Sequence, residues 1–308
     1  LDLATDATPE RVIALAQAAG LRAIPTGIDH GTVTVLAAGE PVEITTFRRD
    51  VETDGRHATV AFSNDLAEDA ARRDFTMNAL YANARGQVHD PLGGLPDLLA
   101  RWVRFVGDPA ARVAEDYLRI LRFFRFTAWY GDPARGMDAE GLAACAAGAE
   151  GLARISAERI GAELRKLLSA PDPAPAVAAM AQAGVLRVIL PGADPRALAP
   201  LVHLEAEHHL PADPIARLAG LGGDDAAQRL RLSRAEAKRL TALRDAATGT
   251  HGPAALGHLL GAKDAGHALT LRGALLEQPV AMSRAVRRRS FPSLPPTCLK
   301  PGARWARG

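Results

Sequence analysis

The feature that most constrains the fold is a change of pattern near residue 95. Before it, alternating apolar and polar residues predict strands at 32–36 and 42–47 and a short strand at 60–62. Helical stretches are predicted at 9–19, with Thr8 as the N-cap, and at 66–78. A glycine-punctuated loop is expected over 24–31, a charged loop over 48–57, and a short hairpin of 80–82 with 87–89. After the segment Asp90-Pro91-Leu92-Gly93-Gly94, strand patterns nearly vanish and helical patterns follow at about 97–103, 109–130, 138–147, 156–169, 173–184 and on to roughly 285. We therefore expect an α+β protein in which a small mixed β-sheet precedes an all-helical part.

The same patterns divide the chain into four expected segments. They are 1–95 with the sheet, 96–150 and 151–286 with helices, and an irregular tail over 287–308 that is rich in proline. The start at Leu1 has no initiator methionine and falls inside a strand pattern, so we expect that the natural beginning is missing. A length of 308 residues is enough for two or more compact units.

Charge and cysteine content limit the classes of function. The net charge of +2 argues against a globally basic surface, so any contact with nucleic acid has to be local. Cys145 and Cys298 lie far apart and are expected to be free thiols. No apolar run reaches the ~18 residues of a membrane span, and no signal-peptide pattern is present at the start. We expect a cytoplasmic protein.

The segment 115–125 carries the most informative charges. At about 100° per residue an α-helix would gather apolar side chains on one side and charged ones on the other. The charged side comprises Glu115, Asp116, Arg119 and Arg122. Carboxylates accept and guanidiniums donate hydrogen bonds, so this face can match the edge of a planar base. Ordinary salt bridges on a solvated helix are the alternative, although Phe123 and Phe126 near this face favour a cleft or a domain junction.

Two further groups of residues suggest phosphate chemistry. Asp2 and Glu43 lie in strand patterns, and neighbouring strands can bring their carboxylates together around Mg²⁺ ions; acids on a strand surface are the alternative. In the run 72–79, a helix would place Asp74 and Asn78 on one face, where they can bind ribose hydroxyls with Arg73 close by for a phosphate. A helix end with ordinary charges explains this run equally well.

Three other motifs favour simpler interpretations. The loop Gly27-Ile28-Asp29-His30-Gly31-Thr32 fits neither the Walker nor the dinucleotide-binding pattern, so we interpret it as a strand-entry turn. A metal site at His203, His208, His209 and Asp213 is not favoured, because adjacent histidines on a helix point about 100° apart. The triplet Arg287-Arg288-Arg289 is interpreted as a solvated tail.

Taken in order, the motifs resemble those of the class II tRNA nucleotidyltransferase and poly(A) polymerase family, which includes the bacterial CCA-adding enzymes. The matching stretches cover roughly residues 1–170 and are Asp2-Leu3-Ala4-Thr5, Thr8-Pro9-Glu10, Pro25-Thr26-Gly27, His30-Gly31-Thr32-Val33, Glu43-Ile44-Thr45-Thr46-Phe47-Arg48, Asp54-Gly55-Arg56, Arg72-Arg73-Asp74-Phe75-Thr76-Met77-Asn78-Ala79, Asp90-Pro91-Leu92-Gly93-Gly94, Val106-Gly107-Asp108-Pro109, Glu115-Asp116 with Arg119, Arg122 and Arg125, and Glu158-Arg159-Ile160.

The resemblance implies an architecture and a set of roles. The segment 1–95 would be a nucleotidyltransferase head, 96–150 a neck with a base-reading helix, and 151–286 a body and tail that bind tRNA. Asp2 would bind the catalytic Mg²⁺, with Glu43 as a further catalytic acid. The nucleotide-binding residues would be Arg73, Asp74 and Asn78 for triphosphate and ribose, Asp116 and Arg119 for the base edge, and Arg122 and Arg125 for phosphates or support of the base-reading pair.

The reaction implied is the template-independent addition of C, C and A to the 3′ end of tRNA from CTP and ATP. The family pattern has Asp-x-Asp after a glycine segment, so Asp2 would be the second acid and the first would lie before Leu1. Two alternatives stay open: a poly(A) polymerase of the same family, or a catalytically dead RNA-binding relative if the first acid is absent. The charged stretch 48–56, which is expected to be shortened in an enzyme that adds only C, favours CCA addition.

Overall fold

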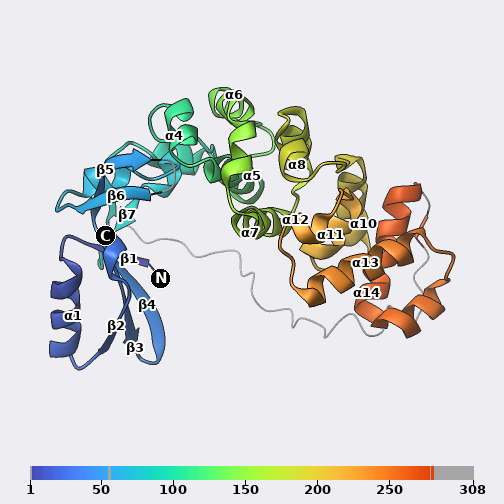
Figure 1. Ribbon diagram of the computed structural model, residues 1–308, viewed down its shortest axis with the longest axis horizontal. Helices are drawn as coiled ribbons and strands as arrows, with labels where there is room; N and C mark the ends of the chain where they lie inside the picture. Colours follow the sequence, from blue (N-terminus) through green and yellow to red (C-terminus); the bar gives the residue numbers. More distant parts are fainter. Residues whose placement is uncertain (1, 55–56, 278, 281–308) are drawn as a thin grey trace, which may run out of the picture. The chain divides into compact units, whose positions relative to one another are not determined.

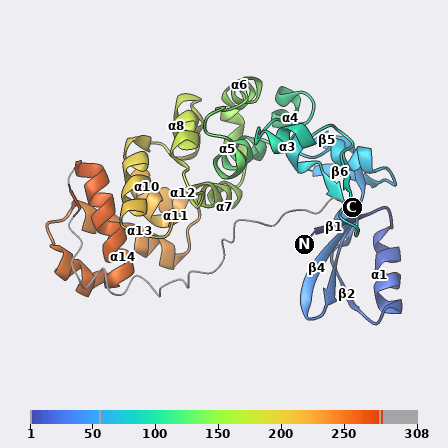
Figure 2. The same cartoon turned by 180° about the vertical axis from the view of Figure 1, so that it is seen from behind.

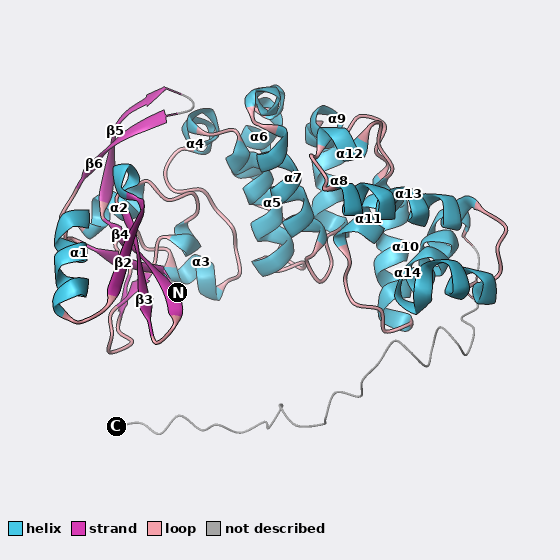
Figure 3. Cartoon of the chain, turned by 60° about the horizontal axis from the view of Figure 1, so that its bottom comes forward, coloured by secondary structure: helices cyan, strands magenta, loops and turns pink. Residues whose placement is uncertain are grey.

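The computed structural model describes residues 2–54, 57–277, 279 and 280. The chain divides into two compact units, and the sequence passes between them more than once. The first comprises Leu1–Pro195 and Gly223–Arg231, and the second comprises Arg196–Gly222 and Leu232–Gly308. The segment borders expected at 95 and 150 both fall inside the first unit and stay predictions. Among the described residues, every strand lies before residue 90, so the expected α+β class is confirmed (Figure 3).

The first unit begins with a mixed sheet of four strands in the order β1-β4-β3-β2 (Figure 1). The strands are β1 (Asp2–Thr5), β2 (Arg22–Gly27), β3 (Thr32–Ala37) and β4 (Glu40–Thr46). β1 pairs with β4 in parallel, and the other two pairs are antiparallel. This is the small mixed sheet that the sequence predicted.

Helix α1 (Pro9–Ala18) lies along this sheet, as both sides of the cartoon show (Figures 1 and 2). Its start is the predicted one, because Thr8 accepts a hydrogen bond from the backbone of Arg11 and proline occupies the first turn. Val12 of the helix packs in one apolar cluster with Val33 and Val35 of β3. Burial of these side chains fixes the helix on the sheet.

Two stretches that the sequence assigned to loops are strands. β5 (Arg48–Asp54) and β6 (His57–Phe62) form an antiparallel hairpin where a charged loop was expected over 48–57, and only the end of β6, at 60–62, was predicted as a strand. The glycine-punctuated loop, expected over 24–31, begins later than predicted. β2 continues to Gly27, and the 3-10 helix η1 (Ile28–His30) follows it. In both places pairing with a neighbouring strand overrides a polar local sequence. The predicted short hairpin of β7 (Tyr81–Ala82) and β8 (Val88–His89) is confirmed.

The predicted single helix over 66–78 is wrong. Helix α2 (Leu66–Ala71) ends before the run of interest, and a 3-10 helix η2 (Thr76–Asn78) follows it. Between them the backbone pairs with a distant segment: Phe75 forms an antiparallel bridge with Phe105, and the amide of Val106 donates to the Asp74 carbonyl at 3.0 Å. This non-local pairing takes the backbone groups that a helix would have used.

The helices that follow agree with the prediction except that α3 begins and ends earlier than the expected 97–103 and that the expected helix over 109–130 is broken. They are α3 (Leu95–Leu99), α4 (Pro109–Glu115), α5 (Leu118–Tyr130), α6 (Ala139–Ala147), η3 (Ala149–Arg154), α7 (Ala157–Leu168), α8 (Ala174–Gln182), α9 (Val185–Ile189) and α12 (Ala226–Arg229). The expected helix over 109–130 is interrupted because Asp116 adopts an extended conformation with φ −150° and ψ 105°. Its carboxylate accepts from the Leu118 amide at 3.0 Å and so competes with the helical hydrogen bonds.

An aromatic cluster joins the 72–79 segment to α5. Phe75 lies 5.1 Å from Phe105, 6.3 Å from Phe123 and 4.9 Å from Phe126, measured between ring centroids. Phe75 and Phe123 are fully buried. These large side chains hold the charged residues of both segments at fixed positions.

The second unit is helical. Its elements are α10 (Leu198–Glu207), α11 (Pro214–Leu221), α13 (Arg234–Thr248) and α14 (Pro253–Leu276), and the short 3-10 helix η4 (Pro195–Ala197) precedes them. Asp213 caps α11 and forms a bidentate ion pair with Arg239, at 2.8 Å for both hydrogen bonds. His267 is buried beside this pair, and within the described part of the chain neither ring nitrogen has a hydrogen-bond partner.

Several expectations about composition can be placed on this framework. Cys145 is a free, buried cysteine, and burial raises the pKa of its thiol; Cys298 and the predicted tail over 287–308 lie outside the described residues. In the described ranges no cluster of three histidine, cysteine or acidic side chains can hold a metal ion. None of the described helices is long and apolar enough to cross a membrane.

Candidate active site

The two strand acids come together through the sheet. Asp2 of β1 and Glu43 of β4 are direct partners in the parallel register, so their Cα atoms lie side by side. Glu43 is exposed. Mg²⁺ prefers oxygen ligands and is usually held by one or two carboxylates together with water and substrate phosphates. Two acids at paired positions of neighbouring strands, of which Glu43 is exposed, fit that requirement.

Arg73 is held by a buried acid and a tyrosine. Its guanidinium donates to Asp69 at 2.9 Å and lies 5.7 Å above the Tyr81 ring, while the Tyr81 hydroxyl donates to the same carboxylate at 2.6 Å. Burial raises the pKa of Asp69, but the bond from Tyr81 and the charge of Arg73 outweigh it, so the net pKa is lowered. Burial and the bond to Asp69 raise the pKa of Tyr81 to about 12. Arg73 therefore has a fixed position and a stable charge.

Asp74 and Asn78 were predicted to bind the ribose hydroxyls, and the structure does bring these two side chains together. The Oδ1 atom of Asp74 accepts from the Phe75 amide at 3.0 Å and from the Asn78 amide group at 2.9 Å. Its Oδ2 accepts from Arg122 twice, from Nε at 2.6 Å and from a terminal nitrogen at 2.5 Å. The pairing of Asp74 with Asn78 was predicted from a helix that is not there; a turn produces it instead.

These four hydrogen bonds use the acceptor sites of the Asp74 carboxylate. Only 6% of the Asp74 side chain is exposed, whereas Asn78 is an exposed residue. Asp74 therefore orients Asn78 and Arg122, and no hydrogen bond from the described residues occupies the amide oxygen of Asn78, which a ligand could use.

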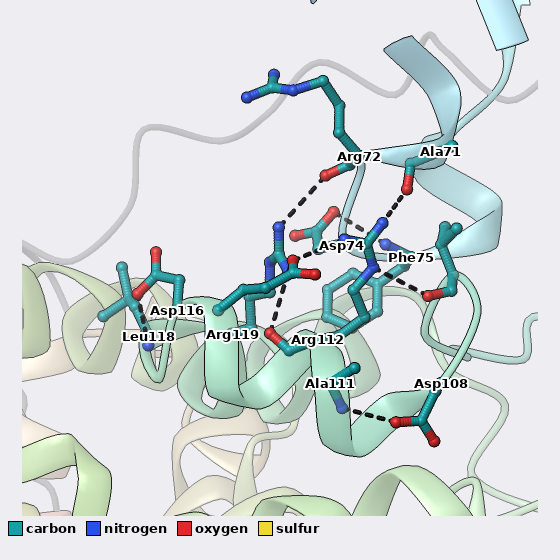
Figure 4. A network of polar contacts seen from close by, with 12 residues as sticks. Ala71, Arg72, Asp74, Phe75, Asp108, Ala111, Arg112, Asp116, Leu118 and Arg119 are labelled. Carbon is teal, nitrogen blue, oxygen red and sulfur yellow. Dashed lines mark hydrogen bonds and ion pairs between the residues drawn. The ribbon is translucent and has the colours of Figure 1, made fainter. Parts of the chain in front are cut away.

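Arg119 belongs to a second network, which Figure 4 shows from close by. Glu115 accepts from both Arg112 and Arg119 and so connects the end of α4 with the start of α5. Arg119 also donates to the Arg112 carbonyl at 3.0 Å and to the Arg72 carbonyl at 3.3 Å. Arg112 in turn donates to the carbonyls of Ala71 and Val106. The network ties the start of α5 to the segment that carries Arg73 and Asp74.

Asp116 is placed apart from Arg119. It is about one-third exposed, at 32%, and its Oδ2 accepts from Arg159 of α7 at 2.7 Å. The expectation that one continuous helix carries Asp116 and Arg119 on the same face is wrong, since the helix breaks at Asp116. The two side chains are instead positioned by separate partners on either side of the break.

Arg125 points toward α7. Its Nε donates to the buried Glu163 at 2.6 Å, and its guanidinium lies 4.6 Å above the Phe126 ring. The guanidinium of Arg122 lies 5.5 Å from the centroid of the same Phe126 ring. Phe126 therefore contacts both arginines, of which Arg122 bonds to Asp74 and Arg125 bonds to Glu163.

Sequence reasoning did not assign roles to the residues that hold the site in place, which are Asp69, Arg112, Glu115 and Arg159. A signal existed for two of them, because Arg112, Glu115 and Arg119 have the i, i+3 and i, i+4 spacing of helical ion pairs. Nothing local in the sequence could have paired Arg159 with an acid 43 residues earlier.

Comparisons with known proteins agree with this geometry. Residues 1–104 match the family described as the poly A polymerase head domain, and residues 137–196 match the probable RNA and SrmB-binding site of polymerase A. The chain is 48% identical over 169 residues to CCA tRNA nucleotidyltransferase 1, mitochondrial, of Homo sapiens, an alignment that covers 54% of this chain and 39% of the human protein. It is 40% identical over 184 residues to the CCA-adding enzyme of Anoxybacillus flavithermus, with 59% and 45% covered.

Among solved structures, the chain is similar to the Bacillus stearothermophilus CCA-adding enzyme in complex with CTP. The TM-score is 0.72 at 31% identity, and the match covers 90% of this chain and 69% of that chain. A Thermotoga maritima CCA-adding enzyme complexed with tRNA has a TM-score of 0.62 at 18% identity, covers 90% of this chain and 72% of that one, and supports the fold alone. The chain spans less than half the length of the two curated relatives named above.

Proposed function

Because the chain belongs to the tRNA nucleotidyltransferase and poly(A) polymerase family, we propose that it adds C, C and A in turn to the 3′ end of tRNA. Its substrates would be CTP, ATP and a tRNA that lacks these nucleotides. The observation that carries the proposal is the junction of α4 and α5, which holds a donor and an acceptor three residues apart. The donor, Arg119, bonds to the Arg72 carbonyl next to the Asp74 segment, and the acceptor, Asp116, is held by Arg159. Base selection by side chains in place of a template requires such a pair.

The reaction would be an attack by the 3′ hydroxyl of the RNA on the α-phosphorus of the nucleotide, with release of pyrophosphate. Asp2 would bind the metal ion, and Glu43 would act beside it as a further catalytic acid, because the two are paired in the β1–β4 register. Mg²⁺ bound there would screen the phosphate charge and activate the attacking oxygen. The protein's own contribution is to hold both acids on adjacent, hydrogen-bonded strands.

The nucleotide would be held by the segment 72–79. Arg73 has the fixed positive charge that suits a triphosphate, and Asn78 has an exposed amide for the ribose hydroxyls. Asp74 would contribute to nucleotide binding by orienting Asn78 and Arg122. Arg122, half-exposed beside it, is the second guanidinium that can reach a phosphate.

The base would be selected by Arg119 and Asp116. Arg119 can donate to O2 and N3 of cytosine, while Asp116 accepts from the exocyclic amine. Adenine also offers an amine donor and a ring-nitrogen acceptor, whereas uracil and guanine present carbonyls where the carboxylate needs a donor. Arg125 would act as support, since its guanidinium is committed to Glu163.

Poly(A) polymerase activity is the second candidate, because this family includes such enzymes. The names of the relatives do not favour it, and the hairpin β5–β6 retains the charged stretch expected in an enzyme that adds both C and A. An RNA-binding protein without activity is the third. The cytoplasmic location stays a prediction.

Incubation of the protein with tRNA lacking CCA, and with CTP, ATP or both, would separate these candidates. We expect two cytidines from CTP alone and a complete CCA from the mixture, and Asp2→Ala should abolish both without unfolding the sheet. Long tracts of A from ATP alone would indicate the polymerase. Retained tRNA binding without incorporation by the unaltered protein would indicate the inactive relative.

A further inference from the structure

The two members of the base-selecting pair are restrained in different ways. Arg119 is only 15% exposed and is fixed from within its own region, by Glu115 and by the carbonyls of Arg112 and Arg72. Asp116 has no such local restraint on its second oxygen. Its Oδ1 accepts from the amide of Leu118, and among the described residues Arg159 of α7 is the only donor to its Oδ2.

The helix that carries Arg159 is itself firmly placed. Ser156 caps its first turn, and its buried residues include Ile160 and Leu164. Gly161 lies against the backbone of Leu230 so closely that a Cβ atom there would overlap the Leu230 carbonyl. Arg159 therefore extends from a rigid base, and its guanidinium can define where the Asp116 carboxylate lies.

We propose that Arg159 is a positioning residue for base selection, which holds the Asp116 carboxylate so that its free lone pairs face the exocyclic amine of cytosine or adenine. This inference rests on the proposed function of Asp116. Each carboxylate oxygen can accept two hydrogen bonds, so Oδ2 can keep Arg159 and still accept from a base. A guanidinium is planar and directional, and it fixes the plane of a carboxylate better than an ammonium group does.

Loss of the Arg159–Asp116 pair should change the preference between nucleotides rather than the stability of the fold. Half of the Arg159 side chain is exposed, at 50%, so the pair contributes little to folding. Without it, the carboxylate would rotate about its side-chain torsions and accept less well from the amine. Loss of a positive charge would weaken the binding of all four nucleotides alike, because each carries the same triphosphate, so the ratio of their affinities isolates the positioning role.

The test is the binding of CTP and UTP, and of ATP and GTP, to the full chain and its variants by calorimetric titration with Mg²⁺. Arg159→Ala should lower the preference for CTP over UTP roughly tenfold, the effect of losing one well-placed charged hydrogen bond. Arg159→Lys should recover part of the preference, because it keeps the charge without the planar geometry. Glu158→Gln is the matched control: it removes the neighbouring exposed ion pair with Arg231, at 3.2 Å, and should leave the ratio unchanged.

Three results would overturn the proposal. One is a fall in affinity of equal size for all four nucleotides in Arg159→Ala, which would mean a general charge effect. The second is a rise in CTP affinity, which would mean that Arg159 blocks Asp116. The third is a loss of preference in Asp116→Ala with none in Arg159→Ala. If the unaltered protein does not distinguish CTP from UTP, the proposed function itself fails, and that outcome is visible before any variant is compared.

Discussion

Replacement of Asp74 by alanine tests the central network most directly. The change removes all four hydrogen bonds that the carboxylate accepts, from Phe75, Asn78 and Arg122. The amide of the fully buried Phe75 then loses the Asp74 acceptor, which costs about 1–3 kcal/mol. Arg122 is 30% exposed, and its guanidinium can bond to water once Asp74 is gone, so loss of this ion pair should cost only about 1 kcal/mol. We expect a decrease of about 2–4 kcal/mol in the free energy of unfolding.

Urea unfolding followed by tryptophan fluorescence would measure this. Trp102 and Trp129 both belong to the first compact unit, so a Trp305→Phe background makes the signal specific to that unit. Glu150→Ala is the control, because its ion pair with Arg187 is almost fully exposed and should contribute less than about 0.5 kcal/mol. A decrease for Asp74→Ala no larger than that of the control would refute the role of Asp74 as a buried anchor.

Three further changes are informative. Arg119→Ala should reduce the discrimination between CTP and UTP while tRNA binding is retained, and an unchanged ratio in a competition assay would count against its role. His267→Leu should change the pH dependence of unfolding: burial lowers the pKa of His267 from 6.5 to about 4, so the unfolded chain protonates first as pH falls through this window. As pH falls from 6.5 to about 4, the free energy of unfolding of the variant should rise relative to that of the wild type by up to about 3 kcal/mol. Parallel plots of unfolding free energy against pH would show that His267 is not buried in its neutral form. Gly161→Ala should destabilise the first unit by about 1–3 kcal/mol, because its Cβ meets the Leu230 backbone, and an unchanged urea midpoint would rule out that contact.

The parts of the fold that local chemistry determines were predictable from the sequence. The cap at Thr8 and the alternation in β3 and β4 were correctly interpreted, because each depends on neighbours within a few residues. The acids at Asp2 and Glu43 could also be expected to meet, since register places strand positions side by side. Their roles in catalysis stay predictions.

The errors have a common physical origin. The backbone at Asp74 and Phe75 leaves the helix to pair with residues near Phe105, about thirty positions later, and no local pattern reports such a partner. The break at Asp116 was missed because apolar periodicity continues through it, although an aspartate can accept from the amide two residues later and so compete with the helical hydrogen bonds. The charged hairpin β5–β6 was missed for the first reason, since strand pairing outweighs polar composition.

The return of residues 223–231 to the first compact unit affects the order in which the chain can fold. Leu230 covers Gly161, its carbonyl accepts from Arg165 at 3.4 Å, and the amide of Asp224 donates to the Pro191 carbonyl at 2.8 Å. During synthesis, the ribosome must therefore release the whole stretch 196–222 before α7 receives its covering segment. A nascent chain paused at Pro195 would expose this face of α7, where chaperones and proteases could reach it.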